Sequence, residues 1–346
     1  MNIAIYGAGS LGTIMGAYLS QSAENVDLID VNEEHINKLN ENGATIKGSI
    51  EFHSKVNAIT PDKINKKYDL VLLLTKQIYN NDVLPIIKNI LNTDGILLSL
   101  QNGVPEHFIS ETIPKEQIIA GSVEFGATYA EPGVSNLTTT YDTFKEYALQ
   151  IGELNGVVTE RIKNIKEVLE HIGGVFVSSN LIGTKWSKLL INSSFSGLSA
   201  ACGCTYGDIM DDEVGIQSAL YIISEGIQVA EKQGIEFEIM SGVDFTQFKI
   251  IDNIEKQTKK LKMIMESNRK LEASMLQDLQ KGRKTEIHYI NGLVAREGDN
   301  IDIPTPYNDK IVEIVSEAEN KKTVPQFSES IAEFAKIIEQ KKELLI

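Results

Sequence analysis

The chain opens on NIAIYGAGSLG at residues 2–12, an apolar run followed at once by three glycines. The apolar run has the length and composition of a buried strand, and the later residues Ile14, Met15 and Ala17 have the apolar spacing of a helix. A Gly-x-Gly-x-x-Gly turn between a strand and a helix is typical of dinucleotide-binding domains. These residues therefore predict a Rossmann-like fold that begins at the first strand.

This glycine turn is predicted to hold a dinucleotide cofactor. Gly7 permits the tight turn, Gly9 lets the backbone approach the pyrophosphate, and Gly12 lets the helix pack closely on the strand. Free backbone amides at the start of a helix favour an anion such as pyrophosphate. A glycine-rich turn without a ligand is the alternative, but the flanking strand and helix favour cofactor binding. The predicted cofactor-binding residues of the turn are Gly7, Ala8, Gly9, Ser10, Leu11 and Gly12.

Asp30 bears on which nicotinamide cofactor is used. It ends the second predicted strand, where a carboxylate accepts hydrogen bonds from the adenosine ribose and repels the 2′-phosphate of NADP. Residues 31–34 include no arginine or lysine that would offset this charge. The alternative is that Asp30 caps a helix beginning near Glu33. We expect NAD to be favoured, with NADP as the other cofactor.

Short apolar runs alternate with amphipathic stretches over the first half of the chain, which predicts a parallel sheet covered by helices on both faces. From Gly183 onward helical periodicity dominates. We predict an α/β fold with a Rossmann-like dinucleotide-binding domain over residues 1–180 and an all-helical domain over residues 181–346. The expected strands are 2–6, 26–30, 69–74, 96–100, 118–122 and 175–178, with hairpin and loop structure over 127–153. The expected helices are 33–42, 81–91, 159–171, 186–201, 214–233, 252–268, 272–280, 286–298, 307–321 and 327–346.

The composition excludes several classes of partner. The 346 residues include 33 lysines and arginines and 48 aspartates and glutamates, which gives a net charge of −15. This negative charge argues against nucleic acid or anionic lipid as a partner. Cys202 and Cys204 have neither the spacing nor the partners of a zinc site or a disulfide framework, so no metal is expected. The first residues lack a signal-peptide pattern, and apolar runs such as 70–74 are far shorter than the roughly 20 residues of a membrane helix. We expect a cytoplasmic protein that binds a small molecule.

Four further segments stand out: LTKQ at 74–77, QNGV at 101–104, KWSKLLIN at 185–192, and SMLQD at 274–278 followed by KTEIHYING at 284–292. Together with the glycine turn, they resemble the ketopantoate reductase (2-dehydropantoate 2-reductase) family over nearly the whole chain and in the family's order. The resemblance implies a two-domain fold like that of 6-phosphogluconate dehydrogenase. It also implies reduction of the C2 ketone of 2-dehydropantoate to (R)-pantoate, a step of pantothenate and coenzyme A synthesis.

The same resemblance implies roles for single residues. A lysine at the position of Lys188 acts as the general acid, and a glutamate at the position of Glu286 orients the substrate and the catalytic groups. Asp278 lies nearby. The implied substrate-binding residues are Asn192, Ser196, Ser274 and Asn102, and the implied additions to the cofactor site are Lys76, Asn102 and Glu286.

The spacing of Lys188, Asn192 and Ser196 agrees with such a site. The three residues are four apart, so on a continuous helix they line one face. An ammonium group there protonates the alkoxide that develops as hydride reaches a ketone carbon. The alternatives are a solvated helix face for Lys188, and Lys185, one turn earlier, as the acid. Ser274 is equally typical of a helix cap.

Two residues depart from the family pattern. Many members carry an asparagine where this chain has Ser196, and the family is usually NADP-dependent, whereas Asp30 favours NAD. The leading function is therefore 2-dehydropantoate reduction with NADH or, second, NADPH. The alternatives are a related reductase of another 2-oxo acid and a non-catalytic NAD-sensing protein. The large helical domain also offers surface for a homodimer.

Overall fold

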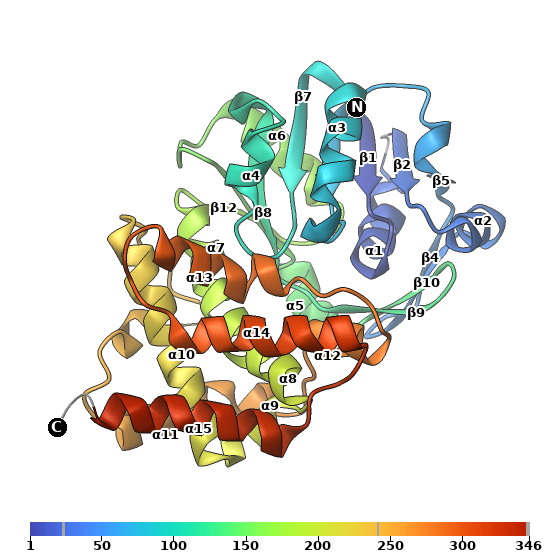
Figure 1. Cartoon of the computed structure of the whole chain (residues 1–346). Coiled ribbons are helices and arrows are strands. Elements are labelled where there is room, and N and C mark those ends of the chain that lie inside the picture. Colours follow the sequence, from blue (N-terminus) through green and yellow to red (C-terminus); the bar gives the residue numbers. More distant parts are fainter. Residues whose placement is uncertain (23–24, 241, 344–346) are drawn as a thin grey trace. The chain divides into compact units, whose positions relative to one another are not determined.

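The computed structural model describes residues 1–22, 25–240 and 242–343 (Figure 1). The chain divides into two compact units, Met1–Ile182 and Gly183–Ile346. Both β-sheets lie in the first unit. The described residues of the second unit form helices and an isolated β-bridge between Met240 and Val243.

An eight-stranded sheet forms the centre of the first unit. In order across the sheet, the strands are β12 (Val175–Val177), β11 (Leu149–Glu153), β8 (Ile118–Val123), β7 (Leu91–Ser99), β6 (Tyr68–Leu73), β1 (Asn2–Tyr6), β2 (Asn25–Ile29) and β5 (Asn57–Ile59). All neighbours are parallel except β11 and β8. The predicted parallel sheet of an α/β fold is confirmed.

Helices cover both faces of this sheet. They are α1 (Ser10–Leu19), α2 (Glu33–Asn42), α3 (Asn80–Ile90), α4 (Glu106–Ser110), α5 (Tyr141–Glu146) and α6 (Glu160–Leu169). Because successive side chains of a strand point to opposite faces, Ile3 and Ile5 of β1 share a core with residues of α1 and α6. Ala4 and Tyr6 pack instead in a second core with residues of α3 and α4. The apolar run before the glycine turn is therefore buried on both sides.

A second, four-stranded sheet was not foreseen from the sequence. Its order is β4 (Phe52–Ser54), β3 (Ala44–Gly48), β10 (Val134–Leu137) and β9 (Ala127–Glu131). Strands β9 and β10 form an antiparallel hairpin within the segment expected to hold hairpin and loop structure. Strand β10 also pairs in parallel with β3, about 90 residues earlier in the chain. Short-range patterns do not report such a pairing, because its partners are distant in the sequence.

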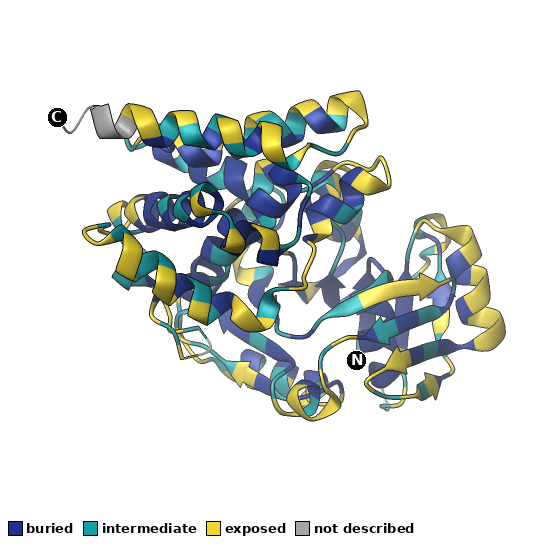
Figure 2. Cartoon of the chain, turned by 90° about the horizontal axis from the view of Figure 1, so that it is seen from below, coloured by how far each residue is buried: buried dark blue, intermediate teal, exposed yellow. Residues whose placement is uncertain are grey.

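The second unit is built from helices, and they agree in position with most of the predicted ones. They are α7 (Leu181–Ile191), α8 (Gly197–Cys202), α9 (Tyr206–Asp211), α10 (Glu213–Lys232), α11 (Ile254–Met265), α12 (Ser274–Gln280), α13 (Asn291–Asp299), α14 (Pro306–Lys321) and α15 (Phe327–Glu343). Figure 2 shows buried and exposed residues alternating along α15, the helix that leads to the C-terminus. Among the described residues, no helix is both long and apolar enough to span a bilayer.

Two predicted helices are interrupted in the structure. The helix expected at 186–201 contains a π-helical turn at Asn192–Ser196, here called the π-turn, between α7 and α8. The helix expected at 286–298 is a 3₁₀ turn at Ile287–Tyr289 followed by α13. Ile290, with φ −108° and ψ −89°, separates these two pieces. The segment 186–201 is therefore helical throughout, as predicted, but not α-helical throughout, whereas the expectation of one continuous helix over 286–298 was wrong. Apolar spacing alone does not distinguish an α-turn from a π- or 3₁₀ turn.

Candidate functional site

The glycine turn follows β1 directly, and each glycine meets a different environment. Gly7 has φ +103°, and a Cβ there would lie 2.7 Å from the backbone nitrogen of Thr75. A Cβ on Gly12 would lie 2.2 Å from the carbonyl oxygen of Gly7. A Cβ on Gly9 would meet no atom of the described chain within 4 Å. The fold itself therefore requires Gly7 and Gly12, whereas Gly9 leaves open space of the kind that a bound pyrophosphate needs.

The start of α1 is the accessible part of the turn. The backbone amides of Gly7 and Ala8 donate to the carbonyl of Ile29 at 2.9 and 3.1 Å, which ties the turn to β2. Residues 9–11 are half-buried, while the residues before and after them are buried. Gly9 is the N-cap and supplies no side-chain hydrogen bond to the helix. The positive end of the helix dipole is thus left for an anion, and the residues present fit a dinucleotide.

His35 forms a hydrogen bond with the glycine turn, a contact that was not predicted from the sequence. Its Nδ1 accepts a hydrogen bond from the Gly133 amide at 3.0 Å, so its proton lies on Nε2, which donates to the Ala8 carbonyl at 2.7 Å. Thr13 Oγ1 donates to the same carbonyl at 2.9 Å. The buried imidazole therefore joins the glycine turn to the β9–β10 hairpin. No local pattern identifies this role, because Gly133 lies 98 residues away.

Asp30 follows β2 on the edge of the sheet where the glycine turn follows β1. Its Oδ1 accepts a hydrogen bond from the Asn32 amide at 3.0 Å. The side chain that caps α2 is that of Asn32, which accepts from the His35 amide at 3.1 Å. The alternative in which Asp30 caps this helix is therefore wrong. Asp30 is half-buried, and residues 31–34 beside it are exposed and carry no positive charge.

Lys76 and Asn102 follow the next two strands at the same edge. Leu73 at the end of β6 is paired with Tyr6 of β1 and with Ser99 of β7, so the residues after these three strands emerge side by side. Lys76 is half-buried and Asn102 is exposed. The cofactor residues predicted in this unit are thus placed along one edge of the sheet.

Buried amide side chains hold the loops after β6 and β7 together. Gln77 Nε2 donates to the carbonyl of Asn102 at 2.5 Å, and Gln101 Nε2 donates to the carbonyl of Thr75 at 2.7 Å. Gln101 also exchanges hydrogen bonds with Asn80 at 2.7 and 3.1 Å. Both glutamines lie within the predicted motifs, but their positioning role depends on a contact that only the fold creates.

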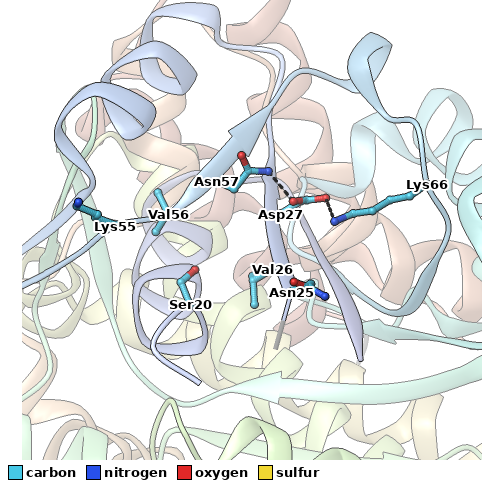
Figure 3. Close-up of a pocket in the computed structure, with 8 residues that line it drawn as sticks. All are labelled: Ser20, Asn25, Val26, Asp27, Lys55, Val56, Asn57 and Lys66. Atoms are coloured by element: carbon cyan, nitrogen blue, oxygen red, sulfur yellow. Dashed lines mark hydrogen bonds and ion pairs between the residues drawn. The ribbon is translucent and has the colours of Figure 1, made fainter. Parts of the chain in front are cut away.

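A polar pocket of about 360 Å³ lies at the opposite edge of this sheet (Figure 3). It surrounds Asp27 near the start of β2, whereas the glycine turn follows the end of β1. The Asp27 carboxylate accepts from Asn57 at 2.6 Å and Tyr68 at 2.7 Å, and it pairs with Lys66 at 2.8 Å. These groups satisfy one another, and none of the predicted site residues lies there. The lining residues are Ser20, Asn25, Val26, Asp27, Lys55, Val56, Asn57 and Lys66.

In the second unit, Lys188, Asn192 and Ser196 share one property. Within residues 183–202, all of them described, they and Ile191 are half-buried, and every other residue is buried. The π-turn begins at Asn192, so the expected regular α-helical spacing to Ser196 was wrong. Ser196 Oγ shares a hydrogen bond of 2.6 Å with the Tyr206 hydroxyl. These polar side chains nevertheless form the accessible part of an otherwise buried helix.

The two lysines of this helix differ in exposure. Lys185 is 3% exposed, as is its neighbour Trp186, whereas Lys188 is half-buried. An ammonium group that exchanges a proton with a substrate and afterwards with water needs access to both. The structure therefore favours Lys188 over Lys185, and it argues against a fully solvated helix face for Lys188.

Helix α12 carries Ser274 and Asp278. Its N-cap is Ala273, whose amide donates to Ser199 Oγ at 3.2 Å. Ser274 is the first helical residue and is exposed, so the alternative in which it caps the helix is wrong. Asp278 is buried. Because α12 contacts both α8 and the π-turn, Ser274 and Asn192 belong to the same part of the second unit.

Glu286 is half-buried and precedes the 3₁₀ turn at Ile287–Tyr289. Its neighbour Thr285 is fixed by α14, because the Thr285 amide and hydroxyl donate to Glu319 Oε1 at 2.6 and 2.5 Å. Thr285 Oγ1 also accepts from the Ile287 amide at 3.1 Å. Glu319 was not predicted, since it is 34 residues from Thr285. The predicted role of Glu286 in orienting the substrate and the catalytic groups stays a prediction.

A glycine turn between the first strand and helix of a Rossmann-like sheet, followed by a helical unit, is typical of the NAD(P)-dependent oxidoreductases. Residues 3–153 match the family model for ketopantoate reductase PanE/ApbA, and residues 180–319 match the model for the C terminal of the same reductase. The chain belongs to the ketopantoate reductase family.

Individual relatives agree with this assignment. The chain is 30% identical over 312 residues to the 2-dehydropantoate 2-reductase of Pyrococcus horikoshii, covering 89% of this chain and 94% of the relative. It resembles the ternary structure of D-mandelate dehydrogenase with NADH and anilino(oxo)acetate, with a TM-score of 0.79, 26% identity, and coverage of 93% and 99%. The PanE/ApbA family ketopantoate reductase of Ralstonia eutropha gives a TM-score of 0.78 at the same identity and coverage.

Proposed function

We propose that this protein is an NAD(P)-dependent 2-dehydropantoate 2-reductase that reduces the C2 ketone of 2-dehydropantoate to (R)-pantoate. This reaction serves pantothenate and coenzyme A synthesis. The observation that carries the proposal is the match to 2-dehydropantoate 2-reductases over about nine-tenths of the chain, including the relative from P. horikoshii. The non-catalytic NAD-sensing alternative is set aside, because the family is one of enzymes.

The proposed cofactor site lies in residues 1–180, on the turn from Gly7 to Gly12 with Asp30, Lys76 and Asn102. When bound, a reduced nicotinamide supplies the hydride. NADH is favoured over NADPH because the Asp30 carboxylate opposes a 2′-phosphate and residues 31–34 provide no compensating cation. The NADH complexes of D-mandelate dehydrogenase, a protein of similar fold, agree with this preference.

The proposed proton donor is Lys188 in the helical domain, residues 181–346. As the C2–H bond forms, the electron pair of the ketone π-bond moves to oxygen, and Lys188 Nζ donates a proton to that oxygen. The product is a hydroxyl group, and the neutral amine regains its proton from solvent. The ammonium charge also stabilises the oxyanion before transfer is complete. Because Lys188 is half-buried, it is accessible both to a substrate and to the solvent that reprotonates its amino group.

The remaining residues are proposed to bind and orient. A 2-oxo acid offers a carboxylate and a ketone as acceptors, and amide and hydroxyl side chains donate to them. Glu286 is proposed to orient the reacting groups and to contact the cofactor. The proposed substrate-binding residues are Asn192, Ser196, Ser274 and Asn102.

A second substrate is favoured by one observation. D-mandelate dehydrogenase has a similar fold at 26% identity and nearly full coverage, and its ligand anilino(oxo)acetate carries a carbonyl group, here an amide, between an aromatic group and a carboxylate, as an aromatic 2-oxo acid does with a ketone. The same proton donor and binding groups serve any 2-oxo acid. The residues that contact the rest of the substrate molecule therefore decide between the two substrates. Ser196, where many family members carry asparagine, shares a hydrogen bond of 2.6 Å with the hydroxyl group of Tyr206.

Steady-state assays at 340 nm test both candidates. The purified protein is assayed with 2-dehydropantoate, or with the aromatic 2-oxo acid whose reduction gives mandelate. Each substrate is tested with NADH and with NADPH in separate series. We expect the highest kcat/KM for 2-dehydropantoate with NADH. Turnover of the aromatic acid alone would assign the second function, and no turnover of either acid with either nucleotide would refute both.

A cytoplasmic location and a homodimer complete the proposal. Cys202 and Cys204 are free thiols, which agrees with a reducing compartment. Ile239, Ile250 and Met263 of the helical unit are large apolar side chains that are more than half exposed, and a subunit interface would cover such residues. Light scattering coupled to size-exclusion chromatography tests the dimer, and a mass of 38.3 kDa would contradict it.

A further inference from the structure

The π-turn leaves backbone carbonyls that the helix no longer satisfies in the regular way. A widened turn shifts the i→i−4 hydrogen bonds, so nearby carbonyls need other donors. Ser194 Oγ donates to the Leu190 carbonyl at 2.6 Å, and Ser193 Oγ donates to the same oxygen at 3.2 Å. The carbonyl of Ser193 itself accepts from the side chain of Asn291 at 2.9 Å. A residue almost 100 positions away therefore holds the middle of this turn.

Asn291 is the end of a buried chain of polar side chains, here called the amide relay. Its Nδ2 also donates to Asn308 Oδ1 at 2.9 Å, and Asn308 Nδ2 donates to Glu225 Oε2 at 2.7 Å. The Glu225 carboxylate accepts in addition from the amides of Tyr307 and Asn308 at 3.0 and 3.1 Å, at the start of α14. Asn291 and Asn308 are completely buried and Glu225 is 7% exposed. The amide relay consists of Glu225, Asn308 and Asn291.

When the Glu225 carboxyl group is ionised, the relay has one direction only. Glu225 accepts, so Asn308 presents its Nδ2 to the carboxylate and its Oδ1 to Asn291. Asn291 must then present Nδ2 to both Asn308 and Ser193, because its Oδ1 would face two oxygen atoms. Gly197 leaves room for this amide, since a Cβ there would lie 2.6 Å from Asn291 Oδ1. The carboxylate on α10 thereby fixes the orientation of the amide at the π-turn.

We propose that Asn291 is a positioning residue of the enzyme, which holds the π-turn so that Asn192 and Ser196 face the substrate beside Lys188. This inference rests on the proposed function of those three residues. The relay ends at the one segment of the helix where the half-buried polar side chains gather. The side-chain amides of Asn291 and Asn308 both donate to acceptors in the relay, whereas Asn291 Oδ1, which lies against Gly197, has no hydrogen-bond partner among the described residues. Buried hydrogen bonds of this kind hold their backbone target in place. Residues that bind a substrate need such support from their surroundings.

Two variants test the role of Asn291. Asn291→Asp keeps the shape but turns both donated hydrogen bonds into contacts between oxygens. Gly197→Ala keeps every relay residue and is favourable for a helix, yet its Cβ displaces the Asn291 amide. We expect each variant to lower kcat/KM for 2-dehydropantoate by about tenfold or more, while the Kd of NADH changes by less than about twofold. Asn320→Asp, at an exposed asparagine of α14, is the matched control and keeps wild-type kinetics.

Hydrogen exchange, which needs no substrate, distinguishes a local effect on the π-turn from a general loss of stability. Amide hydrogen exchange is measured without ligand on peptides from residues 186–199 and from α10. We expect faster exchange in the first peptide and unchanged exchange in the second. A double-mutant cycle with Asn192→Ala is expected to show non-additive losses, because both substitutions act on one turn.

The outcomes distinguish a wrong role for Asn291 from a wrong proposed function. Wild-type kinetics and wild-type exchange in a folded Gly197→Ala protein would overturn the inference, even if Asn291→Asp fails to fold. Equal losses in kcat/KM, NADH affinity and exchange along all helices would also overturn it, since they indicate a merely structural role. A wild-type protein that turns over no 2-dehydropantoate refutes the proposed function, and the exchange experiment still decides whether Asn291 holds the π-turn.

Discussion

Gly9 and Gly12 offer a matched pair of substitutions with opposite expected effects. A Cβ on Gly12 would lie 2.2 Å from the Gly7 carbonyl, which is backbone and cannot swing aside. Overpacking of this kind costs about 1–3 kcal/mol, a sizeable part of a typical stability of about 5–15 kcal/mol. A Cβ on Gly9 meets nothing within 4 Å among the described residues, and Gly→Ala at an unstrained position stabilises a chain by up to about 1 kcal/mol. Gly12→Ala should therefore weaken the ligand-free fold, and Gly9→Ala should not.

The affinity for NADH should distinguish Gly9→Ala from the wild type, although this substitution does not weaken the ligand-free fold. If the pyrophosphate approaches the backbone at Gly9, the added methyl group should raise the Kd of NADH about tenfold or more. At an NADH concentration of about 100 times the wild-type Kd, ligand stabilises the wild type by about 2.7 kcal/mol and a tenfold weaker variant by about 1.4 kcal/mol. Urea unfolding with and without NADH measures both quantities, and calorimetric titration gives the Kd directly. A Gly9→Ala protein that binds NADH as tightly as the wild type would refute this assignment of the turn.

Three further predictions concern single side chains. Lys188→Ala is expected to lower kcat about 10²- to 10⁴-fold with little change in the Kd of NADH, and turnover close to wild type would remove Lys188 from its role. Asp30→Ala is expected to lower the ratio of kcat/KM with NADH to that with NADPH about tenfold, and an unchanged ratio would place the discrimination elsewhere. Burial raises the pKa of Glu225 to about 7. The unfolded chain loses this proton near pH 4.3, so the group's contribution is fully present below that pH and is lost by about pH 7, on the order of 3 kcal/mol. In Glu225→Gln, the free energy of unfolding should therefore fall less as the pH rises from about 4.3 to about 7. Urea unfolding of both proteins over this pH range measures the difference, and parallel curves would show that Glu225 does not cause the decline.

The fold was predictable wherever its cause is local. The strand at Asn2–Tyr6 and the helix at Glu33–Asn42 have the predicted bounds, because an apolar run and an amphipathic period each report their own burial. The π-turn at Asn192–Ser196 was missed, since apolar spacing does not distinguish it from an α-turn and the Asn291 side chain that donates to its Ser193 carbonyl lies 98 residues away. The pairing of β3 with β10 was missed for the same kind of reason.

The candidate site divides in the same way. The glycine turn and Asp30 were predicted from residue types and spacing, and the role of Lys188 was implied by the resemblance to the family. The supporting residues were not predicted, because His35, Asn291, Gln77 and Gln101 hydrogen-bond to partners far along the chain. The structure also removed two alternatives, helix capping by Asp30 and by Ser274, which spacing had left open.

By itself, the sequence determined the class of the fold, the dinucleotide turn and the resemblance to a family of reductases, because strand and helix patterns and short motifs are properties of neighbouring residues. Only the tertiary structure decided which lysine of the helix keeps access to solvent, why Gly9 differs from Gly12, and which distant side chain donates to the π-turn. Exposure, close approach of backbones and buried hydrogen bonds depend on segments that meet only after folding.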